Sequence, residues 1–146
     1  MDEAKADYIR QWLHKAQVDL QSARRLAGPT DPFLDTAFFH CQQAAEKVMK
    51  GYLAFCDHPL VKTHNIKTLV RLAATYERQF LEWRQCAEKL TPYATEFRYP
   101  LETPESLEPN QEQYAEAEQA AAGLFAFVSS LLPEEARLPA GKWGPK

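Results

Sequence analysis

The chain has 146 residues and a mass of 16.7 kDa, close to the commonest size of a single folded domain. Its 45% hydrophobic and 25% charged residues exclude disorder along the whole chain, and no apolar run approaches the ~20 residues that cross a bilayer. The net charge of −3 excludes a polycation that coats nucleic acid. The three cysteines form no CxxC pair and the N-terminus has no apolar leader. Both features predict a cytoplasmic protein with reduced thiols.

Charge is unevenly distributed along the chain. Residues 40–71 carry five cations against two acids, whereas residues 99–136 carry eight glutamates and no lysine or arginine. This contrast predicts either a positive and a negative surface or simply the solvated faces of helices.

The first predicted element is a helix over residues 4–27. Its apolar residues recur at steps of three and four, which places them on one side of a helix. They are Ile9, Leu13, Ala16, Leu20, Ala23 and Ala27. Gly28 and Pro29 then end the helix.

A second helix is predicted over residues 32–56. Asp31 is the expected N-cap and Pro32 the first helical residue, since both types are favoured at helix N-termini. The residues on its apolar side are Phe38, Cys41, Gln42, Ala45, Val48, Met49, Tyr52 and Cys56.

Two further patterns follow a loop at residues 57–59. Thr63 or Asn65 is the expected cap of a third helix. A fourth apolar pattern, over residues 80–94, either continues the third helix or bends away after Tyr76.

The last helix is predicted over residues 110–132, after a proline-rich loop. No stretch alternates as a strand would, so the sequence predicts an all-α, up-and-down bundle of four long helices that allows a short fifth. We expect residues 1–132 to form this one domain. Residues 133–146, which are rich in proline and glycine, are expected to form a flexible tail.

Candidate functional residues appear first on the second helix. His40, Gln43 and Lys47 are spaced i, i+3, i+7 and therefore point the same way, with Lys50 one turn further along. A histidine, an amide and ammonium groups on one face can hold a phosphate or a nucleotide. The alternative is a solvated face in which Glu46 pairs with Lys50.

Two more polar groups follow. Lys62, Thr63 and His64 precede the third helix, where free backbone N–H groups favour an anion, although simple capping explains the same residues. Arg98 lies at the expected end of the fourth pattern, where it either joins a ligand site or satisfies the last helical carbonyls. None of these residues is assigned as catalytic. No motif has metal-ligand spacing, so neither a metal nor a cofactor is expected.

Together these residues resemble the HEPN domain (higher eukaryotes and prokaryotes nucleotide-binding). The resemblance rests on the runs 39–50, 62–66 and 98–100, and it covers residues 4–132. It implies a helical bundle that often forms homodimers. It also implies a minimal nucleotidyltransferase as partner, in a toxin–antitoxin-like pair.

Some members of this family are metal-independent ribonucleases with an Arg followed four to six residues later by a His, and this chain departs from that pattern. No His follows Arg71 or Arg98, and Arg10 and His14 have only three residues between them. The resemblance therefore predicts a module that binds a nucleotide or RNA and has no ribonuclease activity of its own. The alternatives are a ribonuclease that combines His40 with Arg98 across a dimer, and a purely structural interaction subunit.

Overall fold

The computed structural model describes residues 1–90 and 109–139. Within these ranges the chain forms α-helices and two short 3-10 helices, with no strand, so the predicted all-α bundle is confirmed. The elements are α1 (Glu3–Leu26), α2 (Leu34–Phe55), α3 (Ile66–Ala74), η1 (Arg78–Trp83), α4 (Arg84–Leu90), α6 (Gln111–Leu131) and η2 (Glu134–Ala136).

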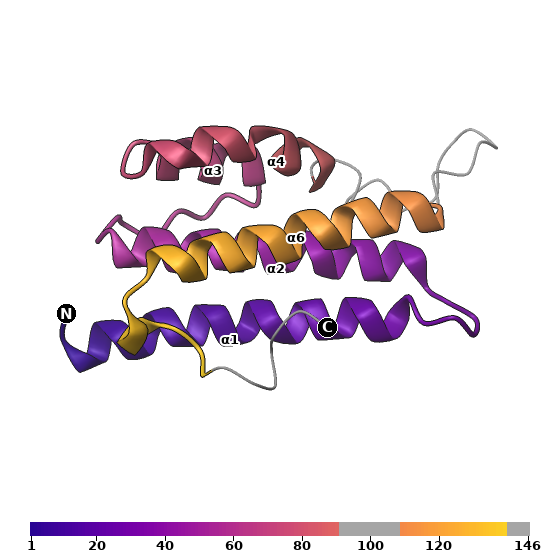
Figure 1. Cartoon of the computed structure of the whole chain (residues 1–146), viewed down its shortest axis with the longest axis horizontal. Helices are drawn as coiled ribbons and strands as arrows, with labels where there is room; N and C mark the ends of the chain where they lie inside the picture. The colour runs from indigo at the N-terminus through magenta and orange to yellow at the C-terminus, as the bar shows by residue number, and fades with distance from the viewer. Residues whose placement is uncertain (91–108, 140–146) are drawn as a thin grey trace.

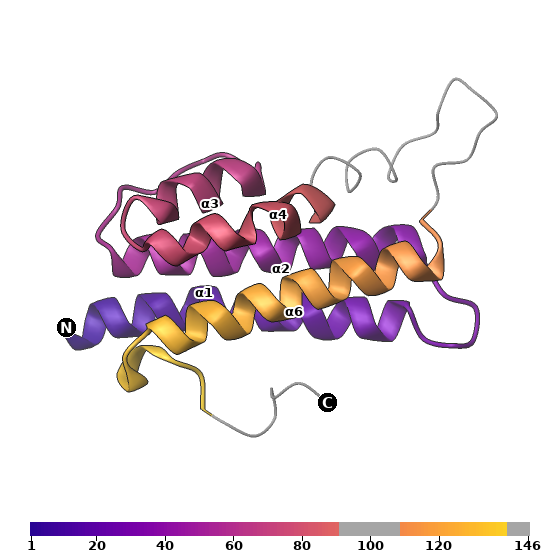
Figure 2. The ribbon, with the colours of Figure 1, turned by 45° about the horizontal axis from the view of Figure 1, so that its top comes forward.

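The helix α2 is central, because it contacts α1, α3, α4 and α6. Figure 1 shows α1 and α2 as an antiparallel hairpin, with α6 lying along α2 and running in the same direction. The short helices α3 and α4 lie side by side, on the opposite side of α2 and α6 from α1 (Figures 1 and 2). Three long helices therefore form the body of the fold, and the α3–α4 pair covers one side of it.

The apolar stripes of the helices face inward and form one core. Its largest fully buried side chains include Ile9, Leu13, Met49, Leu69, Phe80 and Leu124. The close approach of α1 to α2 depends on Gly51, where a Cβ atom would lie 3.1 Å from the Cβ of Trp12. Ordinary Cβ contacts are longer, so a glycine at this position lets the two helix backbones pack tightly.

The start of α2 differs from the prediction. Asp31 has a φ of 54°, in the left-handed region, and the backbone N–H of Phe33 donates to Leu26 O at 2.8 Å. Asp31 is part of the turn between the two helices and cannot adopt the extended backbone of an N-cap. The predicted cap at Asp31 and first helical residue at Pro32 are therefore wrong. The helix begins at Leu34, after an N-cap without a side-chain hydrogen bond.

The chain bends after α3, so the fourth apolar pattern turns away and does not lengthen the third helix. Asn65, one of the two predicted caps, is the N-cap of α3, and its side chain accepts from the backbone N–H of Lys67 at 2.9 Å and of Thr68 at 3.3 Å. Beyond the bend, Glu77 caps η1 by accepting from the N–H of Gln79 at 3.1 Å. The helix α3 therefore ends at Ala74, before this second capped start.

The final helix begins with the reciprocal capping of Asn110 and Gln113, at 2.7 and 2.9 Å. After it, residues 133–139 form the η2 turn, in which Ala136 is buried and which contacts α1. The rest of the predicted tail, residues 140–146, lies outside the described residues, as do residues 91–108.

Candidate functional site

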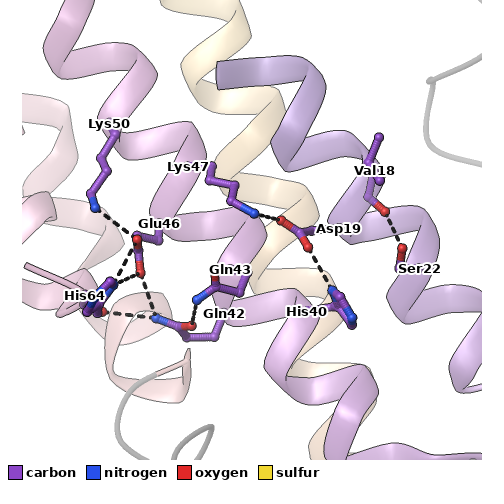
Figure 3. Close-up of polar contacts among 10 residues, drawn as sticks. All are labelled: Val18, Asp19, Ser22, His40, Gln42, Gln43, Glu46, Lys47, Lys50 and His64. Carbon is purple, nitrogen blue, oxygen red and sulfur yellow. Dashed lines mark hydrogen bonds and ion pairs between the residues drawn. The ribbon is translucent and has the colours of Figure 1, made fainter. Parts of the chain in front are cut away.

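A buried carboxylate on α1 holds two of the predicted site residues on α2. Asp19 accepts from Lys47 Nζ at 2.5 Å through one oxygen, and its other oxygen lies 2.8 Å from His40 Nδ1 (Figure 3). The side chain of Asp19 is only 9% exposed, whereas those of His40 and Lys47 are about one quarter exposed. The arrangement fixes Nδ1 of the imidazole on the carboxylate and leaves Nε2 available to a ligand.

A second buried carboxylate organises the other side of α2. Glu46 binds Lys50 Nζ at 3.0 Å, and its two oxygens lie 3.1 and 3.2 Å from His64 Nδ1 (Figure 3). Gln42 donates to the backbone oxygen of His64 at 3.0 Å, which ties the loop before α3 to α2. The predicted pair of Glu46 with Lys50 is present, and both residues are buried.

The remaining predicted residues have different surroundings. The amide nitrogen of Gln43 donates to Gln42 Oε1 at 2.9 Å, so Gln43 lies between the two carboxylate groups (Figure 3). Thr63 Oγ1 accepts from the N–H of Asn65 at 3.1 Å, which is a local turn contact. Lys62 is exposed, and Arg98 lies outside the described residues.

Sequence reasoning gave Asp19 no role and treated Glu46 only as a partner of Lys50. The position of Asp19 carries a signal, because it lies three residues after Ala16 and four before Ala23, two members of the predicted apolar stripe. An acid at such a position is buried and requires a partner on a neighbouring helix. The two carboxylates also mean that two of the predicted cations, Lys47 and Lys50, are bound to internal acids.

A pocket of about 380 Å³ opens at the end of the bundle where α1 begins and α2 ends. Its lining combines two ammonium groups, a histidine, two acids, an aromatic ring and aliphatic side chains. The residues are Asp2, Lys5, Tyr8, Lys50, Leu53, Ala54, Asp57, His58, Pro59, Leu60 and Val61. Lys50 therefore links the Glu46 group to a pocket of a size that holds small ligands.

The ionic groups of this pocket differ in burial. Lys5 pairs with Asp57 at 3.0 Å, but the Asp57 side chain is 79% exposed. Lys50 is 8% exposed, and Glu46 is the one partner of its ammonium among the described residues. An ammonium has three donors, so Lys50 has donors left for a ligand. His58 is held at Nδ1 by the Tyr76 hydroxyl at 2.7 Å.

The cysteines show no sign of nucleophilic activation. Burial raises the pKa of Cys41 to about 12, and it also raises the pKa of Cys56 and of Cys86. The three groups are therefore thiols at neutral pH, whereas a nucleophilic cysteine needs a lowered pKa. Among the described residues, no cluster of His, Cys, Asp and Glu could hold a metal ion, and no helix is both long and apolar enough to cross a membrane.

Comparison with known proteins agrees with this fold. The model of the HEPN domain matches residues 9–131. The crystal structure of an archaeal HEPN homologue aligns with a TM-score of 0.65 and 24% sequence identity, over 84% of this chain and 96% of the homologue. No curated protein matches the sequence. Since the family model spans most of the chain, the resemblance found in the sequence is confirmed, and the chain belongs to the HEPN domain family.

Proposed function

We propose that this chain is a nucleotide-binding module and that the 380 Å³ pocket between α1 and α2 is its binding site. The observation that carries the proposal is the buried ammonium of Lys50 in the pocket wall, which has one protein partner among the described residues and donors to spare. A phosphate oxygen is a strong acceptor for such a group.

The second cation of the pocket completes a phosphate site. Lys5 lies on α1 and lines the same pocket as Lys50. Its ion pair with Asp57 is at the surface, where such pairs contribute about 1 kcal/mol or less, so a phosphate can replace the carboxylate at little cost.

The pocket also offers a surface for a base. Tyr8 is 45% exposed and Leu60 is 61% exposed, and both line the pocket. A planar base gains apolar contact by lying against an aromatic ring, and this contact is similar for every base. The proposal therefore expects recognition of the nucleotide class with little choice among bases.

The test is a titration of the purified chain with adenosine and guanosine phosphates, followed by two-dimensional NMR of backbone amides. We expect shifts around Lys50 and Leu53. Lys50→Met should weaken binding about 10- to 100-fold, because one charge-assisted contact is worth ~1.5–3 kcal/mol. Lys15→Met, on an exposed part of α1, is the matched control and should leave binding unchanged.

Lys50 also contacts Glu46, so its replacement affects the fold as well as the pocket. Tyr8→Ala removes the exposed ring without touching that pair and should weaken binding several-fold, with only a small fall in melting temperature from the loss of its edge contact with Trp12. Nucleotides that cause no amide shifts around this pocket, or that bind both variants as tightly as the parent chain, would contradict the proposal.

One observation favours the alternative of a ribonuclease. His40 has its Nδ1 beside buried Asp19, an arrangement that orients Nε2, which has no hydrogen-bond partner among the described residues, as a proton acceptor or donor. RNA cleavage measured in a chelator, with His40→Ala and with His64→Ala as a second histidine variant, tests this function. Metal-independent cleavage that is lost in His40→Ala supports a ribonuclease, and absence of cleavage supports binding alone.

A nucleotidyltransferase partner and a homodimer stay predictions from the family resemblance.

A further inference from the structure

A second hollow lies between α3 and the η1–α4 segment. The helices α3 and α4 lie side by side in Figure 2. It measures about 240 Å³ and is lined by Lys67, Val70, Arg71, Leu81, Arg84 and Glu88. Three of these residues are cations and one is an acid, so the lining carries a net charge of +2. Of the residues predicted for nucleotide binding that the structure describes, none lines it.

The cations of this hollow have no carboxylate partners among the described residues. Arg84 donates through Nε to the backbone oxygen of Leu81 at 3.2 Å, which leaves its terminal nitrogens free of protein contacts in those ranges. Lys67 and Arg71 are one helical turn apart on α3, and like charges at this spacing repel each other. This differs from Lys47 and Lys50, whose charges are balanced by buried acids.

The floor of the hollow is apolar. Val70 is buried beneath the cations, while Leu81 is 41% exposed at the rim. A ligand that fits both features has an anionic head and a small apolar body. Arginine guanidinium groups bind phosphate and carboxylate heads through paired hydrogen bonds.

We propose that this hollow binds a phosphomonoester with an apolar body, either a small molecule or a phosphorylated side chain of a partner. A phosphomonoester carries about −1.5 to −2 charges at pH 7 and so balances the net charge of the lining. A carboxylate carries a single negative charge and would leave one positive charge of the lining unbalanced. Binding of a phosphate group by paired arginines is a recurring mode of phosphate recognition.

The test is a titration with phenyl phosphate, followed by NMR of backbone amides at fixed ionic strength. The expected shifts are centred on Val70, Arg71 and Leu81, away from those expected for nucleotides at Lys50. Arg71→Gln and Arg84→Gln should each weaken binding at least tenfold. Arg78→Gln is the matched control, because Arg78 is exposed on η1 and does not line the hollow, and it should have no effect.

Three further probes separate the features of the site. Leu81→Ser should weaken phenyl phosphate but leave inorganic phosphate unchanged, since only the former has an apolar body. Benzoate should bind at least tenfold more weakly than phenyl phosphate. A phosphotyrosine peptide that binds more tightly than phenyl phosphate identifies a protein source, and equal affinity identifies a small molecule.

The proposal is overturned if phenyl phosphate causes no shifts at these residues, or if benzoate binds equally well. It is also overturned if Arg78→Gln weakens binding as much as Arg71→Gln, because the attraction would then be general to the surface. Loss of nucleotide binding at Lys50 has no bearing on these outcomes, since the two sites share no lining residue in the part of the chain that the structure describes.

Discussion

The carboxylate of Asp19 and the ammonium of Lys47 lie 2.5 Å apart across the contact between α1 and α2, although they are separated by 28 residues in the chain. Asp19 is nearly buried and also contacts His40. A charge in this position is stable only with partners, because removing it from water costs several kcal/mol. The pair therefore fixes how the two helices are aligned.

Replacing Asp19 should destabilise the chain, because two side chains of α2 then lose their shared acceptor. Asp19→Ala leaves Lys47 and His40 without their acceptor, and we expect a loss of about 1–3 kcal/mol in the free energy of unfolding. This loss is smaller than that for a fully buried ion pair, because both partners are partly exposed to solvent. Chemical denaturation measures it. Asp7→Ala, at an exposed acid of the same helix, is the control and should change stability by less than about 0.5 kcal/mol.

A double-mutant cycle of Asp19→Ala with Lys47→Met tests whether the two residues interact energetically. We expect a coupling of about 0.5–3 kcal/mol, the range for residues in direct contact. Simple additivity of the two substitutions would show that the contact between them contributes nothing to stability.

The cap of α3 gives a second prediction. The side chain of Asn65 accepts from two backbone N–H groups, whereas Thr63 accepts from the N–H of Asn65 alone. Asn65→Ala should therefore cost about 1 kcal/mol of stability, and Thr63→Ala should cost clearly less. Equal losses in thermal unfolding would contradict the assignment of Asn65 as the cap.

The helices were predictable because apolar periodicity is local, and the cap of α3 was narrowed to two residues. The apolar steps in residues 4–27 and 110–132 repeat with the period of a helix, and they match α1 and α6 to within one residue at each end. Asn65 is one of the two caps predicted for α3, whereas the predicted range 110–132 places Asn110 inside the helix that it caps. The start of α2 was mispredicted because the left-handed turn at Asp31 depends on how α1 and α2 pack.

The partners of the candidate site residues were not predictable from spacing. Helical spacing correctly placed His40, Gln43 and Lys47 on one face of α2, but the acid that binds two of them comes from α1. Lys50 was grouped with those residues, yet it lies in the wall of the pocket at the end of the bundle. Such contacts depend on the alignment of whole helices, which a single sequence does not encode in any local pattern.

The two glycines packed against tryptophans should differ in their tolerance of a methyl group. At Gly51, a Cβ would lie 3.1 Å from the Trp12 Cβ, an atom fixed to the backbone of α1. At Gly123, a Cβ would meet the edge of the Trp83 ring at 3.2 Å, and a ring can rotate slightly. Alanine gains about 1 kcal/mol of helix propensity at either position.

We therefore expect Gly51→Ala to be destabilising by about 1–2 kcal/mol, since forced packing in a core costs ~1–3 kcal/mol and exceeds the gain in propensity. Gly123→Ala should be closer to neutral. The midpoints of urea unfolding of the two variants measure this difference. A Gly51→Ala variant more stable than the parent chain would show that α1 and α2 can separate without cost.

Stability should fall in alkaline solution, and Cys41 should account for part of the loss. Burial raises the pKa of Cys41 from 9.0 to about 12, so between these values the unfolded thiol loses its proton while the folded thiol keeps it. The unfolded state then binds fewer protons than the native state, and stability decreases as the pH rises. The contribution of this thiol is complete below pH 9 and is lost progressively from pH 9 to about 12.

At pH 10 the loss from Cys41 amounts to about 1–2 kcal/mol, relative to neutral pH. Burial also raises the pKa of Tyr52 and of Tyr114 above the ordinary value of 10.0. These two tyrosines therefore contribute to the loss of stability only at higher pH. Unfolding by urea at pH 7, 9 and 10 should show a decline that is smaller in Cys41→Ala by about that amount. The matched variant Cys86→Ala, at a half-buried thiol with a smaller rise in pKa, should retain most of the decline. An identical alkaline decline in Cys41→Ala and the parent chain would mean that this thiol titrates alike in the folded and unfolded states.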